Sequence, residues 1–413
     1  MPKNEVLCVV PWVHLNFEPD GKVIPCCLTN SYNYFVGDLN KDSIEEIWNS
    51  ENMKGLRRQF IEGNKPKICS SCFDLEKTTK KSVRYFRNKE FSDVINIIPD
   101  VTEPDGTCNT LELKFWDFRF SNLCNFKCRS CGPRYSSAWV SDFKKLKWSN
   151  QEKVWNIQGI EKQSNFEFLK TQIPYVNQIY FAGGEPLLMQ EHWQILDLLT
   201  EHKKFNVKIN YSTNCSTFKY NGKNVLNYWK QWNNNKIEIL PSIDEIEERA
   251  ELIRHGTEWN VVEKNLKLLV QLDNVSIKPC ITVGAWNVKR LPVIISRLIE
   301  IGVINIKKQY QNFVINLLEQ PSYYHVHILP NQYRKEVIIE LKEFISNYNK
   351  TYNTSIDHIF LQIIEELDKP YNQASAKEFL WYTEQIDSIR NENLFTTIPE
   401  LCIIKEINQK EIQ

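Results

Sequence analysis

The sequence predicts an α/β fold, because strand-like and helix-like segments alternate over residues 111–310. Repeated alternation of this kind is typical of a parallel sheet whose strands are joined by helices. Six such units indicate a partial, TIM-like (β/α)6 barrel. A cysteine-rich stretch before it indicates a small N-terminal α+β domain, and helical periodicity after it indicates a C-terminal helical extension. The expected domains are 1–80 (cysteine-rich domain), 81–110 (linker), 111–310 (barrel) and 311–413 (mainly helical extension).

Apolar runs of strand length predict the strands of the barrel. They lie at 111–121, 178–182, 206–213, 236–243 and 275–284, with a weaker one near 303–309. Amphipathic stretches between them predict helices at 190–203, 222–232, 258–271 and 288–301. In barrels of this kind the chemistry lies at the carboxyl ends of the strands.

The flanking segments also carry local signals. Residues 17–23 contain Pro19-Asp20-Gly21, which predicts a β-hairpin. Asp42, with Glu45 three positions later, predicts the start of a helix. Apolar spacing in the tail predicts helices at 335–348, 356–367 and 376–389.

Composition excludes some classes of function. Lys and Arg together number 51, as do Asp and Glu, so the balance argues against a domain that neutralises nucleic-acid phosphates. No apolar run approaches the ~18 residues that span a bilayer, and the first residues lack a secretory pattern. Most of the twelve cysteines fall in tight local groups, which favours metal binding in a reducing compartment. We therefore expect a cytoplasmic protein without a membrane partner.

The most informative motif is the cysteine triplet Cys124, Cys128 and Cys131, which follows the first predicted strand. Three thiolates this close together form a soft-metal site. They are one fewer than the four cysteines that usually hold a [4Fe–4S] cluster, so one iron would remain open to a small molecule. A zinc knuckle or buried thiols are the alternatives for this triplet taken alone.

A second motif, Gly183-Gly184-Glu185-Pro186, follows the strand predicted at 178–182. The two motifs, in this order and each at a strand end, resemble the radical S-adenosylmethionine (radical SAM) superfamily. The resemblance implies the partial barrel and a [4Fe–4S] cluster held by the three cysteines. It further implies that the fourth iron binds SAM, and that one electron releases a 5′-deoxyadenosyl radical from it. The cysteines would then be the catalytic residues.

The resemblance extends to later strand ends. It implies that the cofactor is bound by Gly183, Gly184, Glu185, Pro186, Ser212, Thr213, Asn214, Ser242, Asp244, Arg254 and Val283. In the family, Glu185 would hold the ammonium of SAM, Ser242 its ribose and Arg254 its carboxylate, for which a guanidinium fork is suited. The sequence departs from the family at Cys215, where a glycine is usual, and at Ser130, where an aromatic residue is common.

A further four cysteines precede the barrel: Cys8, Cys26, Cys69 and Cys72. Four thiolates are the full set for an auxiliary [4Fe–4S] cluster. Their spacing resembles the SPASM/twitch auxiliary-cluster domains of radical SAM enzymes, although those usually follow the barrel. A four-cysteine zinc ribbon is the competing interpretation. Cys27 adjoins Cys26 and is an alternative ligand.

Together these patterns predict a radical SAM enzyme that abstracts hydrogen from a peptide or a small metabolite, assisted by one auxiliary cluster. An electron donor such as a flavodoxin or ferredoxin is implied, and a nucleic-acid partner is not expected. The alternative is a non-catalytic iron–sulfur or zinc protein that uses the barrel as a scaffold.

Overall fold

The computed structural model describes residues 5–29, 33–78, 81–146, 163–306 and 313–410. The described residues form two compact units. The first contains the chain up to Leu123 and the segment that ends at Asn210; the second contains the segment that begins at Cys124 and everything from Tyr211 onward. Both units combine helices with parallel strand pairs, so the predicted α/β class is confirmed, and each unit also contains antiparallel pairs.

Five neighbouring strands organise the first unit, in the order β6-β4-β1-β2-β3. Its strands are β1 (His14–Phe17), β2 (Lys22–Ile24), β3 (Gly37–Asp38), β4 (Phe115–Phe118) and β6 (Gln178–Phe181). β1 and β2 form the predicted hairpin, with Phe17 opposite Val23. The same β1 runs parallel to β4, and β4 runs parallel to β6. The N-terminal hairpin is therefore part of the same sheet as the first two barrel strands predicted from the sequence.

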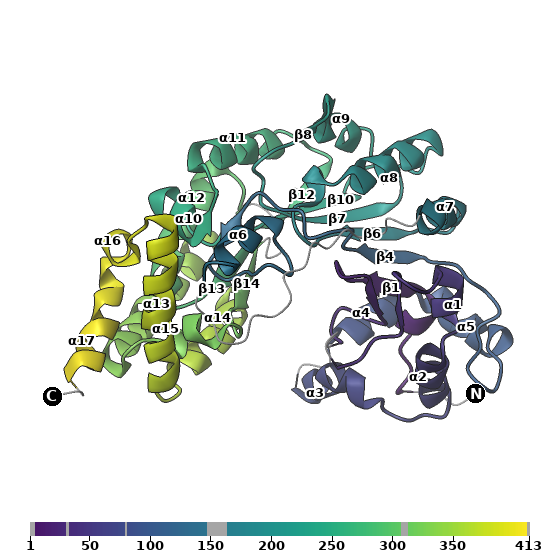
Figure 1. Ribbon diagram of the computed structural model, residues 1–413, viewed down its shortest axis with the longest axis horizontal. Helices are drawn as coiled ribbons and strands as arrows, with labels where there is room; N and C mark the ends of the chain where they lie inside the picture. The colour runs from purple at the N-terminus through teal and green to yellow at the C-terminus, as the bar shows by residue number, and fades with distance from the viewer. Residues whose placement is uncertain (1–4, 30–32, 79–80, 147–162, 307–312, 411–413) are drawn as a thin grey trace. The chain divides into compact units, whose positions relative to one another are not determined.

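Five helices of the described residues lie around the hairpin in the first unit (Figure 1). They are α1 (Ile44–Trp48), α2 (Glu51–Ile61), α3 (Ser70–Thr78), α4 (Val83–Glu90) and α5 (Ser92–Val101). The unit also contains α7 (Gln163–Gln172) and α8 (Gln190–Glu201), which lie near β6. Residues 81–110, expected to be a linker, thus carry α4 and α5. The sequence supports α4 because Ser82 caps it, its side chain accepting from the Tyr85 N–H.

The predicted start of α1 at Asp42 is wrong by one residue. Ser43 is the N-cap: its Oγ accepts from the Glu46 N–H at 3.2 Å, and the Glu46 carboxylate accepts from the Ser43 N–H at 2.8 Å. Asp42 instead accepts a hydrogen bond from the Asp38 N–H at 2.9 Å. The Asp42 carboxylate therefore stabilises the turn before the helix, and the capping box belongs to the next pair along the chain.

The second unit contains several short ladders. Its strands are β5 (Lys127–Cys128), β8 (Lys219–Tyr220), β9 (Lys223–Asn224), β10 (Ile237–Pro241), β11 (Arg254–His255), β12 (Val275–Ile277), β13 (Cys280–Val283) and β14 (Val314–Leu317). β10 pairs with β12 and β13 with β14, both parallel, whereas β5 and β11 are antiparallel. β7 (Lys208–Thr213) begins in the first unit, where Gln178 donates to Asn210, and ends in the second, where the Thr213 carbonyl accepts from Ser242.

Two strand predictions need correction. The strand predicted at 275–284 is divided into β12 and β13, with Lys278 and Pro279 between them. Proline lacks the N–H that a ladder requires, so the division falls where the sequence cannot continue the pairing. The weak strand near 303–309 is not found over residues 303–306, and its remainder lies outside the described residues.

The tail is mainly helical, as predicted. The helices of the second unit are α6 (Val140–Phe143), α9 (Val225–Trp229), α10 (Glu247–Ile253), α11 (Trp259–Val270), α12 (Leu291–Ile301), α13 (Asn331–Tyr352), α14 (Asp357–Leu367), α15 (Gln373–Arg390), α16 (Leu394–Thr397) and α17 (Cys402–Lys410). α13 packs on α14, and α15 packs on α17 (Figure 1). None of the helices in the described ranges combines the length and apolarity needed to cross a membrane.

Two glycines of the first unit provide a matched test of its packing. Gly106 and Gly63 both have positive φ angles, of 91° and 78°. A Cβ at Gly106 would lie 2.1 Å from the Lys54 carbonyl oxygen, whereas a Cβ at Gly63 would meet nothing within 4 Å. We expect Gly63→Ala to cost about 1–2 kcal/mol of stability for the backbone conformation alone. Gly106→Ala should cost about 1–3 kcal/mol more because of the overlap. Equal shifts in melting temperature by circular dichroism would contradict this expectation.

Candidate metal centres

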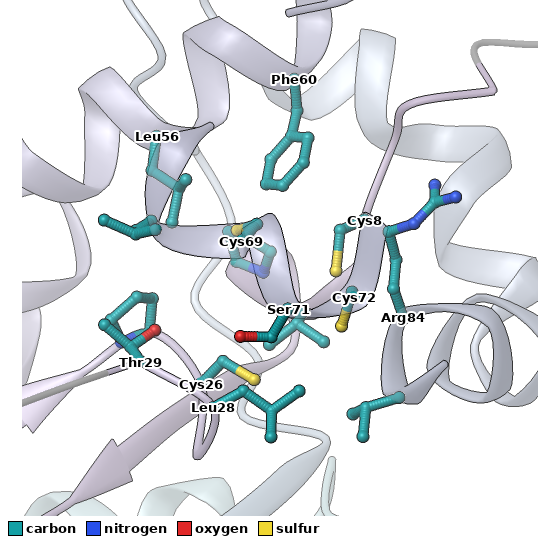
Figure 2. A pocket seen from close by; sticks show the side chains of 15 residues that line it. Cys8, Cys26, Leu28, Thr29, Leu56, Phe60, Cys69, Ser71, Cys72 and Arg84 are labelled. Atoms are coloured by element: carbon teal, nitrogen blue, oxygen red, sulfur yellow. The ribbon is translucent and has the colours of Figure 1, made fainter. Parts of the chain in front are cut away.

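Four cysteines of the first unit line one cavity, which encloses about 490 Å³ including space open to solvent. Cys8 comes just before the short helix Val10–Trp12, Cys26 follows β2, Cys69 ends the short helix Lys67–Cys69, and Cys72 lies in α3. Figure 2 shows the sulfur atoms of Cys8 and Cys72 close together, with that of Cys26 directed toward the same space. The hairpin and the helix pair thus gather cysteines that are 64 residues apart in the sequence.

The cavity distinguishes Cys26 from its neighbour. Cys26 belongs to the lining, and Cys27 does not; Cys27 is exposed at the surface. The Cys27 thiol forms a hydrogen bond with the Cys26 thiol and lies within electrostatic range of Asp117 and Arg119. Of the two candidate ligands that the sequence left open, Cys26 is therefore the one placed with Cys8, Cys69 and Cys72.

The remaining lining is largely apolar, and this has an electrostatic consequence. Leu56 and Phe60 form part of the wall (Figure 2). Burial raises the pKa of Cys8 and of Cys69 to about 12 in each case. Because thiolates are the metal-binding form, loading this site must release protons. Four cysteines around one space match the ligand set of a [4Fe–4S] cluster and that of structural zinc.

Arg84 forms one wall of the cavity and ties three segments together. Its Nη1 donates to the carbonyl oxygens of Glu5 and Leu7, each at 2.8 Å, and its Nη2 pairs with the Glu76 carboxylate at 2.5 Å. The guanidinium points away from the sulfur atoms of Cys8 and Cys72 (Figure 2). Its positive charge nevertheless opposes the increase in the pKa of both Cys8 and Cys69. Arg84 therefore favours the thiolate forms without contacting them.

In the second unit the triplet Cys124, Cys128 and Cys131 lies in one compact loop. The Cys131 N–H donates to the Cys128 carbonyl at 3.0 Å, and Trp139 Nε1 donates to the same carbonyl at 2.8 Å. Ser136 Oγ closes the loop by donating to the Phe126 carbonyl at 2.6 Å. Burial raises the pKa of Cys128, and it raises that of Cys131 to about 12. As in the first unit, metal binding here must displace protons.

Arg254 lies directly opposite Cys128 in the antiparallel β5–β11 ladder. Its Nη1 donates to Asp244 Oδ2 at 2.7 Å, and Asp244 Oδ1 accepts from the Thr282 N–H at 2.8 Å. Burial alone would lower the pKa of Arg254, but the nearby Cys128 and Asp244 raise it. The two predicted residues Asp244 and Arg254 are thus brought together beside the cysteine loop.

The other predicted residues of this unit occupy neighbouring positions. Asn214 Nδ2 donates to the Asn125 side chain in the cysteine loop at 2.9 Å. The Ser242 N–H donates to the Thr213 carbonyl, and Ser242 forms a bridge with Cys280. Ser212 lies in β7, and Val283 ends β13. Cys215, at the usual glycine position, is fully buried with a φ of 56°, so the left-handed conformation is kept without the glycine.

The predicted Gly183-Gly184-Glu185-Pro186 motif belongs to the first unit and contacts the chain end before the cysteine loop. A Cβ at Gly184 would lie 2.2 Å from the carbonyl oxygen of Leu123, which precedes Cys124 in the sequence. The Glu185 N–H donates to that same carbonyl at 2.7 Å. The Glu185 side chain is buried and accepts from the Leu187 N–H at 3.3 Å. Glycine is therefore required at position 184 by the close approach of the two backbones.

A set of ion pairs that the sequence did not reveal anchors the cysteine loop to the helical tail. Arg129, which is fully buried, pairs through Nη2 with Asp387 of α15 at 2.5 Å and with Glu392 at 2.6 Å. Lys127 pairs with Asp142 at 2.9 Å, and Asp142 also pairs with Arg390 of α15 at 2.8 Å. The tail thus supports the loop that carries the cysteines. Beyond the presence of Lys127 and Arg129 in the loop, the sequence offered no signal for these partners.

In the ranges that the structure describes, no group of three or more Cys, His, Asp or Glu side chains forms a ready-made site for a single metal ion.

The SPASM family model, described as an iron–sulfur cluster-binding domain, matches residues 8–73. The match spans all four cysteines of the cavity. It confirms the predicted iron–sulfur domain in this part of the chain. No curated protein matches the chain.

Solved structures to which the chain is similar include one described as native anSMEcpe with bound AdoMet. It has 17% sequence identity and a TM-score of 0.40, and the alignment covers 58% of this chain and 61% of that one. Another is the crystal structure of Streptococcus suis SuiB bound to S-adenosylmethionine, with 12% identity, a TM-score of 0.37 and coverage of 84% and 71%. The chain spans less than two thirds of the length of the former protein.

We expect Cys26→Ser to remove the metal of the first unit and Cys27→Ser to leave it in place, because only Cys26 lines the cavity. Anaerobically reconstituted protein should lose about four irons per chain in the first variant and none in the second. The adjacent position is the matched control, since both variants replace one thiol with one hydroxyl. Iron loss in Cys27→Ser alone would contradict this ligand assignment.

Removing one anchor of Arg129 should loosen the cysteine loop of the second unit. Asp387→Asn leaves a buried guanidinium with less compensation, so we expect a loss of about 3 kcal/mol in stability and reduced iron at the three-cysteine site. The matched control is Glu400→Gln, which breaks the Arg249–Glu400 pair between α10 and the tail. That pair does not involve the cysteine loop, and its loss should leave the iron content unchanged. Equal iron contents in the two variants would contradict an anchoring role.

Proposed function

We propose that this chain, whose residues 8–73 match the SPASM iron–sulfur cluster-binding domain, is a radical SAM enzyme. The observation that carries the proposal is the compact three-cysteine loop with the Arg254–Asp244 pair beside it. Three thiolates leave one iron of a [4Fe–4S] cluster without a protein ligand. The nearby guanidinium offers a partner of the kind that a carboxylate-bearing ligand requires. The partial (β/α)6 barrel and the domain boundaries stay predictions.

Cys124, Cys128 and Cys131 would hold the first cluster, and Cys8, Cys26, Cys69 and Cys72 the auxiliary one. When bound, the first cluster supplies the electron that cleaves SAM and releases a 5′-deoxyadenosyl radical. The chain's own contribution is to bind and orient the cofactor and to exclude side reactions. The largely apolar lining of the four-cysteine cavity serves this purpose at the auxiliary site.

The roles of the SAM-binding residues follow from the resemblance and agree with the chemistry of the side chains. Glu185 would accept the ammonium, Ser242 would contact the ribose and Val283 the adenine. Arg254 would hold the carboxylate. It retains donors for that task, because only Nη1 is bonded to Asp244, and its buried Nε has no hydrogen-bond partner among the described residues. Asp244 would then fix the direction of the guanidinium.

The substrate we propose is a peptide, with a small metabolite as the second choice, and the reaction is hydrogen abstraction from an unactivated carbon. A flavodoxin or ferredoxin would supply the electron, in a reducing compartment such as the cytoplasm, where twelve cysteines remain thiols. The auxiliary cluster has four protein ligands, so its expected role is electron transfer more than direct substrate binding.

Removal of the three cysteines should abolish SAM cleavage. After anaerobic reconstitution and reduction with dithionite, we expect 5′-deoxyadenosine from the unaltered chain and none from Cys124→Ala/Cys128→Ala/Cys131→Ala. Cys402→Ala, in α17, is the matched control for loss of a thiol and should retain the product. If a chain with its full iron content makes no product, a SAM-binding titration decides the outcome. Tight binding would indicate substrate gating, and no binding would favour a non-catalytic metal protein.

A further inference from the structure

The positive charge of this chain is concentrated around the cysteine cavity of the first unit. Residues 54–89 contain eleven Lys and Arg but only three Asp and Glu, whereas the whole chain has 51 of each kind. This one segment therefore carries an excess of eight positive charges, and the rest of the chain carries the opposite excess. The segment includes Cys69 and Cys72, two of the four cysteines that line the cavity.

Some of these cations are buried or form ion pairs within the first unit. Arg57 is fully buried, Arg84 pairs with Glu76, and Lys77 pairs with Asp74 at 2.7 Å. Others are exposed, and we call Lys65, Lys67 and Lys89 the basic surface. Within the described ranges, neither Lys67 nor Lys89 has an ion-pair partner. Such charges contribute little to stability, so their excess is available to a partner.

The first unit contains a broad groove with about 1840 Å³ of space, part of it open solvent. Lys65 and Lys89 line this groove together with Arg84. Tyr85, which is 43% exposed, adds apolar area to the wall. The groove thus combines exposed positive charge with an exposed aromatic side chain, as protein interfaces commonly do.

The groove and the cysteine cavity share a wall. Arg84 lines both of them, and it stands beside Cys8 and Cys72 in Figure 2. Lys67 lies two positions before Cys69 in the sequence. The cavity also reaches the surface, because Leu28 and Ser71 of its lining are exposed and Cys69 is partly exposed. A cluster bound by the four cysteines would therefore lie next to the basic surface.

We propose that the basic surface docks an acidic one-electron carrier protein of the flavodoxin or ferredoxin class. The carrier would deliver its electron to the cluster held by Cys8, Cys26, Cys69 and Cys72. The step transfers one electron: the carrier is oxidised by one, and the cluster is reduced from the 2+ to the 1+ state, with no bond or proton exchanged. The inference rests on the proposed function, in which the enzyme consumes electrons from outside.

The position of the charge favours a protein carrier over a nucleic acid. The charge adjoins the cysteine cavity, which is the proposed redox site, and redox complexes are typically small and held by electrostatics. A partner bound in this way should associate quickly and weaken as salt rises.

The test reverses the charge of the surface. Lys65→Glu/Lys67→Glu/Lys89→Glu is compared with Lys335→Glu/Lys342→Glu/Lys350→Glu, which makes the same charge change on exposed lysines of α13. Affinity of the reconstituted holoenzyme for an acidic flavodoxin is measured by calorimetry at low and moderate salt. Cluster reduction by the reduced flavodoxin and by dithionite is followed in parallel by absorbance.

We expect the basic-surface variant to bind flavodoxin at least tenfold more weakly and with less dependence on salt, while the α13 control stays close to the unaltered chain. Dithionite should reduce all three proteins equally, which shows that the clusters are intact. The proposal is overturned if both variants weaken binding alike, if neither does, or if single-stranded RNA binds this surface and flavodoxin does not. The proposed function fails separately, when dithionite-reduced holoenzyme binds flavodoxin but makes no 5′-deoxyadenosine.

Discussion

Gathering four thiols around one space is the constraint on which the first unit depends. Cys8 and Cys26 belong to the two ends of the β1–β2 hairpin, and the register Phe17 opposite Val23 decides how close those ends lie. A slip of one residue would turn every side chain of the hairpin to the other face of the sheet. Cys69 and Cys72 come from a short helix and the α3 start, so their spacing is local. The hairpin register therefore determines whether Cys8 and Cys26 lie close enough to form one site with Cys69 and Cys72.

The three-cysteine loop of the second unit differs, because its cysteines are close in sequence but its conformation depends on distant residues. Its three cysteines are neighbours in sequence, so little chain entropy is lost in gathering them, but a short loop needs support to hold one shape. The support comes from far away in the chain: Arg129 from Asp387 and Glu392, and Lys127 from Asp142. The helical tail, which the sequence predicted only as a helical extension, thus helps to hold the loop in place.

Features that depend on neighbouring residues could be predicted from the sequence, and features that depend on distant residues could not. The hairpin, the main helices and the two groups of cysteines could be predicted from local patterns. Turn residues, apolar periodicity and cysteine spacing each lie within a short stretch of the sequence. Asp387 and Glu392 lie 258 and 263 positions from Arg129, and no local pattern connects them. Close competitors also misled the sequence analysis, as at α1, where Asp42 and Ser43 both satisfy the rule for a cap. Pro279 indicates the break between β12 and β13, but the apolar residues around it led to the prediction of one continuous strand.

The two cysteine sites also differ in how the surrounding charge is used. Three cations of the three-cysteine loop and its neighbouring strand have acidic partners: Lys127 has Asp142, Arg129 has Asp387, and Arg254 has Asp244. Charges compensated in this way hold a loop in place and add little field at a distance. Around the first site, by contrast, the excess positive charge is exposed and acts outward. We therefore expect an electron from a partner to enter at the four-cysteine site, where the positive charge is not compensated. Chemistry that needs a fixed geometry is expected at the three-cysteine loop, where the charges are paired.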